Sequence, residues 1–392
     1  MPEKENSLSL YFHIPFCTAK CGYCDFNSYA LETLIDKNQI QKTSWASEYT
    51  DALIREIKTR AKELQLKGIK VESVFFGGGT PSLFPPEEIE RILTTVKIYF
   101  NLSPNIEISL EANPNSSDYR LFKKLNAAKI NRISFGVQSF NNKLLKNLDR
   151  LHSGSEAKDA FFSAREAGFK NISIDLMFGI PFQTKRIAYS DIQTAINLDP
   201  EHISAYELTI EPGTSFHALH LKGELEGLAN EKLSLEMWEM RDKLLQDAGY
   251  EQYEISNFSK PEFFCKHNLN YWNRGDYLGI GAGAHSLIDN KRFWNHLRPD
   301  TYIKNSQSPT AGEEKMEDKV KILGESLMLG LRLKDGISLR KLKRKTGLDS
   351  EDLFQDNFQD FYKKKLLIKD RGKLKLTKKG MLLSNQIFSC LL

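Results

Sequence analysis

The stretch HIPFCTAKCGYCDF, residues 13–26, ends an apolar segment with three closely spaced cysteines, Cys17, Cys21 and Cys24. The chain has 392 residues and 5 cysteines, so three of the five lie in this segment. An odd number with three clustered argues against a disulfide framework and predicts a reducing compartment, the cytoplasm. Thiolates bind soft metal ions, so the cluster predicts a metal site.

The bulk composition is that of a soluble globular protein, with 40% hydrophobic and 27% charged residues. The net charge of +4 is too small by itself to indicate a nucleic-acid partner. The first ten residues, MPEKENSLSL, do not read as a signal peptide. No apolar run approaches the ~18 residues of a transmembrane helix.

Six short segments rich in β-branched and aromatic residues read as buried strands: 8–16, 71–81, 105–114, 132–140, 171–181 and 202–210. Helix-like stretches lie between them, at 45–65, 86–98, 117–128, 155–167 and 187–198. The strand–helix unit recurs at about thirty residues, the size of a βα repeat. This alternation predicts an α/β fold with a parallel sheet and right-handed crossovers.

Polar and glycine-rich residues follow these strands at Gly77–Pro81, Glu111, Gln138 and Asp175. The carboxyl ends of parallel strands meet at one edge of the sheet, where α/β proteins build their sites. Six units are too few for an eight-fold barrel. A partial, curved barrel and a doubly wound sheet both fit this count.

The regular alternation of strands and helices ends after residue 215. We therefore predict three regions, 1–215, 216–303 and 304–392. The polar stretch 304–318 reads as a linker. From residue 319 the pattern predicts three helices and a hairpin that turns at Asp370–Gly372. That combination is typical of a mainly helical, winged-helix-like domain.

The spacing of the clustered cysteines is C-x3-C-x2-C. Structural zinc sites usually have four ligands, and here Cys265 and Cys390 are isolated while His13 would be an awkward fourth ligand. Three cysteines can hold three irons of a cubane cluster and leave one iron open for a substrate. Zinc and unliganded thiols stay as alternatives, and the iron–sulfur cluster is favoured.

CTAKCGYC after the first strand and GGGTP after the second resemble the radical S-adenosylmethionine superfamily. The resemblance implies a partial (β/α)6 barrel in which the three cysteines hold a [4Fe–4S] cluster. It also implies that the amino and carboxylate groups of S-adenosylmethionine chelate the fourth iron.

The same resemblance implies a set of S-adenosylmethionine-binding residues at the strand ends: Gly78, Gly79, Thr80, Glu111, Gln138, Arg150 and Asp175, with Tyr11 and Thr209 as weaker matches. Glycines let the backbone approach a charged ligand closely. Carboxylates accept hydrogen bonds from ammonium or ribose groups, and a side-chain amide can both donate and accept them. The arginine guanidinium can bind a carboxylate with two parallel hydrogen bonds.

The order of the motifs YFHIPFC, FFGGGTPS, EANP, ISFGVQSF, DLMFGIP and HISAYELTIEPGT resembles the oxygen-independent coproporphyrinogen III oxidase family, from residue 8 to about 290. The porphyrinogen dehydrogenases of that family continue the motif as C-x3-C-x2-C-x-C. Here Asp25 and Phe26 follow Cys24, so the fourth cysteine is absent and decarboxylation is disfavoured.

The heme-chaperone branch of the same family carries H-N-x-x-Y-W, which is present at 267–272. The resemblance implies that the chain binds heme and delivers it to respiratory proteins at the membrane, and it allows for a homodimer. His267 is the candidate heme ligand. A structural His267 with core Tyr271 and Trp272 is the alternative, and Cys265 is a rival ligand.

The basic stretch RKLKRKTG, 340–347, with Lys363–Lys365, reads first as a solvated helix face and second as a face for an anionic membrane. Three functions therefore compete. The favoured one is a heme chaperone with a [4Fe–4S] cluster, S-adenosylmethionine and heme. The others are a radical enzyme that cleaves S-adenosylmethionine and oxidises a porphyrinogen, and a zinc-stabilised binding protein.

Overall fold

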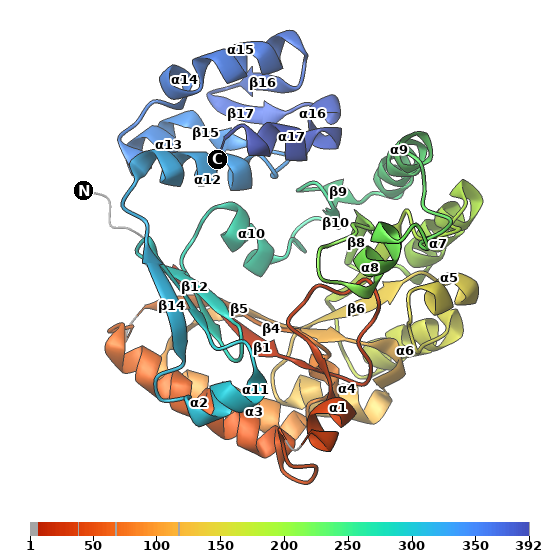
Figure 1. Ribbon diagram of the computed structural model, residues 1–392, viewed down its shortest axis with the longest axis vertical. Coiled ribbons are helices and arrows are strands. Elements are labelled where there is room, and N and C mark those ends of the chain that lie inside the picture. Colours follow the sequence, from red (N-terminus) through yellow and green to blue (C-terminus); the bar gives the residue numbers. More distant parts are fainter. Residues whose placement is uncertain (1–6, 38, 67–68, 117, 392) are drawn as a thin grey trace.

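The computed structural model describes residues 7–37, 39–66, 69–116 and 118–391. Its centre is a curved twelve-stranded sheet in the order β14-β13-β12-β11-β1-β4-β5-β6-β7-β8-β10-β9. Figure 1 shows this sheet with helices along its outer side and the C-terminal helices across its open side. The six predicted strands are its parallel core: β1 (Ser7–Ile14), β4 (Lys70–Gly78), β5 (Asn101–Ala112), β6 (Arg132–Gln138), β7 (Ile172–Phe178) and β8 (His202–Glu207).

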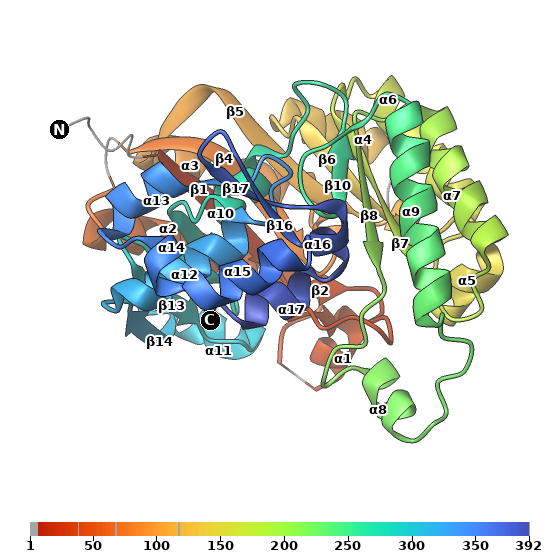
Figure 2. The ribbon, with the colours of Figure 1, turned by 90° about the horizontal axis from the view of Figure 1, so that it is seen from above.

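The crossover helices confirm the predicted alternation: α2 (Trp45–Glu63), α3 (Pro86–Tyr99), α4 (Tyr119–Ala127), α6 (Gly154–Glu166) and α7 (Lys185–Leu198). Ser153 caps α6 in a capping box with Glu156, and the Thr184 hydroxyl caps α7. A further helix, α9 (Glu231–Asp247), packs beside α7 (Figure 2). The α/β class with a partial, curved barrel is therefore confirmed.

Later parts of the chain extend both edges of the sheet. Strand β11 (Tyr277–Ile280) pairs in parallel with β1, and β12 (His285–Ile288), β13 (Lys291–Asn295) and β14 (Thr310–Lys315) continue antiparallel. The expectation of a linker is wrong for 310–315, which form strand β14 paired with β13. An edge strand has one unpaired side, so its charged sequence TAGEEK suits solvent.

Alternation along the strands separates an apolar outer face from a polar concave face. On β1 the buried Leu8, Leu10, Phe12 and Ile14 alternate with Ser9, Tyr11 and His13. The register places polar residues side by side on the concave face, as in Ser9–Ser73–Glu107, Ser109–Arg132 and Ser134–Ser173–His202. A buried polar lining of this kind indicates a binding site rather than a packed apolar core inside the barrel.

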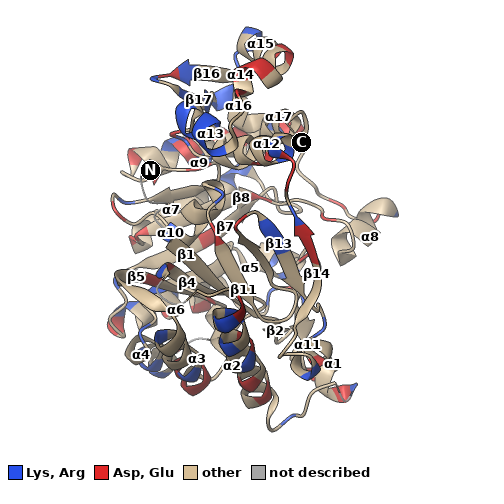
Figure 3. Cartoon of the chain, turned by 90° about the vertical axis from the view of Figure 1, so that its left-hand side faces the viewer, with Lys and Arg blue, Asp and Glu red and all other residues tan. Residues whose placement is uncertain are grey.

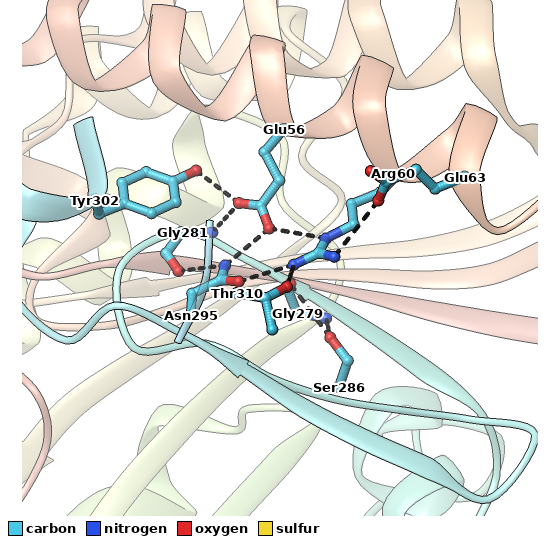
Figure 4. Close-up of polar contacts among 9 residues, drawn as sticks. All are labelled: Glu56, Arg60, Glu63, Gly279, Gly281, Ser286, Asn295, Tyr302 and Thr310. Carbon is cyan, nitrogen blue, oxygen red and sulfur yellow. Dashed lines mark hydrogen bonds and ion pairs between the residues drawn. The ribbon is translucent and has the colours of Figure 1, made fainter. Parts of the chain in front are cut away.

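A buried carboxylate ties the later strands to the first crossover helix. Glu56 of α2 accepts hydrogen bonds from the Tyr302 hydroxyl (2.6 Å), the Asn295 amide (2.8 Å) and the Gly281 backbone N–H (2.9 Å), and it pairs with Arg60 (Figure 4). Arg60 also donates to Asn295 and to the Thr310 hydroxyl. The network therefore holds β11, β13 and β14 against α2.

The C-terminal part packs around a second apolar cluster, which includes Leu323, Leu327 and Phe358 and also Phe178 and Trp238 of the barrel. It contains α12 (Lys319–Gly330), α13 (Leu339–Thr346), α14 (Ser350–Leu353), α15 (Gln355–Lys363), α16 (Lys378–Leu382), α17 (Ser384–Ser389) and a small sheet of β15 (Ile337–Ser338), β17 (Lys373–Leu376) and β16 (Leu367–Asp370). The predicted hairpin turn is confirmed, since Asp370 pairs with Lys373. The described part of this region has six short helices where the sequence pattern predicted three. Division of the chain at 215 and 303 stays a prediction. No described helix has the length and apolarity needed to cross a bilayer.

Candidate functional site

A cavity of about 450 Å³ opens on the concave face at the carboxyl ends of the parallel strands. It is the meeting point of most of the residues singled out from the sequence: Cys17, Cys21, Cys24, Gly78, Gly79, Thr80, Glu111, Gln138, Arg150, Asp175 and Thr209. These residues come from seven separate segments of the chain. Tyr11 and His267 do not line the cavity.

The three cysteines lie on one loop after β1. Cys17 ends the short strand β2 (Phe16–Cys17), and Cys21 and Cys24 share a turn closed by the Cys24 N–H and the Cys21 carbonyl (3.1 Å). The Thr80 hydroxyl donates to Cys17 Sγ (3.4 Å), and Arg150 Nη1 lies 3.8 Å from Cys21 Sγ. The loop thus presents three thiols to one cavity.

Burial raises the pKa of the Cys17 and Cys21 thiols, while the Arg150 guanidinium opposes this shift at Cys21. A nearby cation stabilises a thiolate, the form that binds metals. Within the described residues, no three His, Cys, Asp or Glu side chains converge on one metal ion. The ligands of a multi-iron cluster bind different irons, so their sulfur atoms need not converge.

The glycine run after β4 has a packing role that the sequence alone did not show. Gly78 has φ +115°, and a Cβ there would lie 2.4 Å from the His13 ring. A Cβ at Gly79 would lie 2.7 Å from the Phe16 carbonyl oxygen, and the Gly79 N–H donates to the Ile14 carbonyl (2.8 Å). These glycines let the end of β4 pack directly against the start of the cysteine loop.

Two carboxylates stand side by side on the concave face. Glu111 Oε2 accepts from the Gly78 N–H (3.1 Å), and burial together with the charge of Asp175 raises the pKa of Glu111 to about 7. Burial also raises the pKa of Asp175, which accepts from the hydroxyls of Ser134 (3.0 Å) and Ser173 (3.2 Å). The pair can therefore bind cationic or hydroxyl groups of a ligand.

Gln138, Arg150 and Thr209 complete the upper part of the cavity. Gln138 has φ +66°, a strained conformation for glutamine, and its Oε1 accepts from the Tyr206 hydroxyl (2.7 Å). Arg150 donates to the Gly136 carbonyl (2.5 Å) as well as toward Cys21. Thr209 lies exposed at the rim, after β8.

The structure places His267 behind the cavity wall, on α10 (Lys266–Trp272), the helix between the sheet and the C-terminal helices in Figure 1. It is 1% exposed, and its ring nitrogens bond the Ser73 hydroxyl (2.9 Å) and the Tyr271 hydroxyl (3.1 Å). Burial lowers the pKa of His267 to about 3. Tyr11 is half-buried on β1 and bonds His13 Nδ1 (3.0 Å).

Sequence reasoning missed several cavity residues, including Arg132, Ser134, Ser204, Tyr206 and Asn257. Four of them lie on β6 and β8, which the sequence predicts as buried strands. Their signal was the alternation of polar with apolar residues in RISFGVQ and HISAYE, which marks a polar concave face. Asn268, next to His267, also lines the cavity.

Comparisons with known proteins agree with this architecture. Residues 11–190 match the radical SAM superfamily, and residues 319–383 match the HemN C-terminal domain. The solved structure of coproporphyrinogen III oxidase (HemN) from Escherichia coli superposes with a TM-score of 0.82 at 23% identity, over 98% of this chain and 90% of that one. At this identity the superposition supports the fold alone.

Full-length relatives are closer in sequence. The heme chaperone HemW of Haemophilus influenzae is 37% identical over 390 residues, which cover 98% of each chain. The heme chaperone HemW of Bacillus subtilis is 37% identical over 391 residues, 98% of this chain and 99% of the relative. The chain therefore belongs to the HemW heme chaperone family of the radical SAM superfamily.

Proposed function

We propose that this chain is a cytoplasmic heme chaperone that binds a [4Fe–4S] cluster, S-adenosylmethionine and heme, and delivers heme to respiratory proteins at the membrane. One observation carries the proposal. Three cysteines and the strand-end polar residues meet at a single cavity, in a chain that aligns over 98% of its length with relatives named heme chaperones.

The donor set suits an iron–sulfur cluster. Cys17, Cys21 and Cys24 offer three thiols, and Arg150 places a positive charge 3.8 Å from Cys21 Sγ, where it favours the thiolate. A bound cluster supplies one-electron redox chemistry and a fourth iron that no cysteine of this loop ligates. The chain contributes the loop that positions the thiols and the cavity beside them.

The residues beside the loop suit S-adenosylmethionine. Glu111 and Asp175 offer acceptors for its ammonium and ribose groups, and Gln138 offers both a donor and an acceptor. The glycines at 78 and 79 line the cavity wall without side chains. When the ligand binds, each of these polar groups would replace a contact with solvent or with the protein by a contact with the ligand.

Heme coordination by His267 requires a local rearrangement. Both ring nitrogens are engaged, so an iron ligand could form only when the ring gives up Ser73 or Tyr271. Helix α10 is short, and its N-terminus is held by Glu107, which accepts from the Lys266 and His267 N–H groups (3.0 and 3.3 Å). A shift of this helix would expose the histidine.

The porphyrinogen dehydrogenase alternative is less supported. Phe26 occupies the position of its fourth cysteine, and the Phe26 side chain is 61% exposed near the cavity mouth. Incubating the reconstituted protein with coproporphyrinogen III and S-adenosylmethionine under reducing conditions checks this alternative. Formation of protoporphyrinogen would overturn our proposal in favour of the enzyme.

A charge asymmetry supports an anionic partner for the C-terminal part. Residues 319–392 contain 18 Lys and Arg against 8 Asp and Glu, net +10, while residues 1–318 carry net −6. Figure 3 shows basic residues on α13 and on the β16–β17 hairpin. We expect binding to vesicles containing anionic lipid, weakened by salt and by Arg340→Glu with Arg344→Glu. Equal binding to neutral vesicles would contradict a charge-driven contact.

The central experiment is anaerobic reconstitution followed by iron, sulfide and hemin titration. We expect a brown protein that binds hemin, and we expect Cys21→Ser to lose the cluster. Cys390→Ser is the matched control, because Cys390 is exposed and lies far along the chain from the loop. A protein that binds neither iron and sulfide nor hemin would refute the proposal. Gel filtration of the same samples reports the oligomeric state.

A further inference from the structure

Arg132 is a buried cation on the concave face that the sequence motifs do not include. It begins β6, its register partner on β5 is Ser109, and it lies one step below Ser134, the partner of Glu111. Arg132 lines the cavity and is 2% exposed. The guanidinium therefore forms part of the cavity floor beneath the proposed S-adenosylmethionine residues.

The Arg132 guanidinium has no hydrogen-bond partner among the described residues. Its Nε is buried without a hydrogen bond, and among the described residues no hydrogen bond or ion pair within 4.0 Å reaches its other nitrogens. Burying a charged group without hydrogen bonds is costly. By contrast, the equally buried Arg241 donates to Asp242, to the Ala205 carbonyl and to the Ile255 carbonyl.

The nearby acids do not use Arg132 as a donor. Glu107 accepts from Cys265 Sγ (3.5 Å) and from the backbone N–H of Lys266 (3.0 Å). Asp175 accepts from the hydroxyls of Ser134 and Ser173. Arg132 balances their charge at longer range, while its N–H groups stay available to a ligand.

Two other polar atoms near Arg132 are also unpaired. Within the part of the chain that the structure describes, Ser109 Oγ, on the strand next to Arg132, and Asn257 Oδ1, on a residue that lines the cavity, have no hydrogen-bond partner. On β5 the register partner of Arg132 is the small side chain of Ser109. This part of the sheet therefore combines a fixed positive charge with unsatisfied polar atoms.

We propose that Arg132 binds a carboxylate group of the ligand that occupies the cavity. The planar guanidinium fork matches a carboxylate, and a water-excluded floor strengthens such a charge-assisted pair. The identity of the ligand rests on the proposed function, which offers two carboxylate sources. One is a propionate of heme, and the other is the amino-acid carboxylate of S-adenosylmethionine.

The test uses the full chain, reconstituted anaerobically, and measures dissociation constants by equilibrium titration. The ligands are hemin, hemin dimethyl ester, S-adenosylmethionine and decarboxylated S-adenosylmethionine. We expect Arg132→Gln to weaken one carboxylate-bearing ligand by about tenfold or more, because a charge-assisted pair is lost. Its carboxylate-free counterpart should bind the parent and the variant alike. The ligand that loses affinity identifies the source.

Arg132→Lys keeps the positive charge that balances Glu107 and Asp175, so this variant replaces Arg132→Gln if the latter folds poorly. We expect Arg132→Lys to lose an intermediate amount of ligand affinity, because lysine lacks the planar guanidinium. Arg241→Gln is the matched control: it removes a buried guanidinium outside the cavity and should leave ligand affinity unchanged.

The inference is overturned if both variants bind all four ligands as the parent does. It is also overturned if carboxylate-free ligands lose affinity to the same extent. A parent protein that binds neither hemin nor S-adenosylmethionine would refute both this inference and the proposed function. Binding in the parent that is insensitive to Arg132 refutes this inference alone.

Discussion

Two glutamates on opposite sides of the same sheet, one buried and one half-buried, behave differently. Glu56, behind β11, accepts hydrogen bonds from Tyr302, Asn295 and Gly281 and pairs with Arg60. Glu111, on the concave face, accepts one hydrogen bond within the described residues, from the Gly78 N–H. Burial raises the pKa of both carboxyl groups. The number of partners distinguishes the two sites.

The difference separates polar groups that hold the fold from polar groups that await a ligand. A fully hydrogen-bonded network contributes rigidity, whereas an incomplete one costs free energy until something binds. By this criterion the network of Figure 4 is structural, and the floor formed by Glu111, Asp175 and Arg132 is functional. Substitutions at the two sites should therefore have opposite effects on stability.

The largest expected effect is at Glu56. Glu56→Ala removes one partner of a buried ion pair, takes the acceptor from the Tyr302 hydroxyl, and removes one acceptor each from Arg60 and Asn295. We expect the free energy of unfolding to fall by about 3–5 kcal/mol, measured by urea denaturation. Glu63→Ala is the control, because Glu63 also pairs with Arg60 but its side chain is 55% exposed. If Glu56→Ala lowered the free energy of unfolding no more than Glu63→Ala, the structural role of the Glu56 network would be contradicted.

The second effect concerns pH and Glu111. Its pKa of about 7 in the folded chain lies above its ordinary value of 4.5. The native state therefore binds more protons between these values, and the free energy of unfolding falls as pH rises from about 4.5 to about 7. The full change is about 3 kcal/mol. Denaturation of the ligand-free protein across this range measures it.

Glu111→Gln should flatten that pH profile, since the amide imitates the protonated acid. We expect the variant to be at least as stable as the parent at pH 8 and to bind S-adenosylmethionine about tenfold more weakly. Glu107→Gln is a useful comparison, because Glu107 holds the N-terminus of α10 and should lose stability instead. A destabilised Glu111→Gln protein at pH 8 would make Glu111 structural.

The smallest effects compare two tyrosine hydroxyls. Tyr302→Phe removes a donor to the Glu56 carboxylate, and hydrogen bonds to charged groups contribute about 1.5–3 kcal/mol. Tyr206→Phe removes a donor to the neutral Gln138 amide in the cavity, with an expected cost of about 1 kcal/mol or less. Thermal denaturation measures the stability lost in each variant. A larger loss in Tyr206→Phe than in Tyr302→Phe would contradict the contrast between the structural network and the cavity.

Much of the fold was predictable because its signals are local. The six parallel strands and five crossover helices follow from hydrophobic periodicity and from glycine, proline and cap residues. The strand-end residues Glu111, Gln138 and Asp175 were also predictable as neighbours, because parallel strands end at one edge. Their meeting with the cysteine loop in one cavity agrees with that prediction.

Other features depend on contacts between distant segments and were not predictable. The charged stretch 310–315 read as a linker, but pairing with β13 makes it an edge strand. The motif at 267–272 indicated a heme ligand, whereas packing against Phe75 and a bond to Ser73 place His267 in the interior. Arg132 carried no motif at all.

The sequence by itself determined the α/β alternation, the spacing of the three thiols and the identity of the strand-end groups, because each depends on residues close together in the chain. Only the tertiary structure decided which buried polar groups are satisfied. Hydrogen-bond satisfaction depends on partners such as Asn295 for Glu56, which is 239 positions away. The same dependence leaves Arg132 without a hydrogen-bond partner among the described residues, on a floor built from several strands.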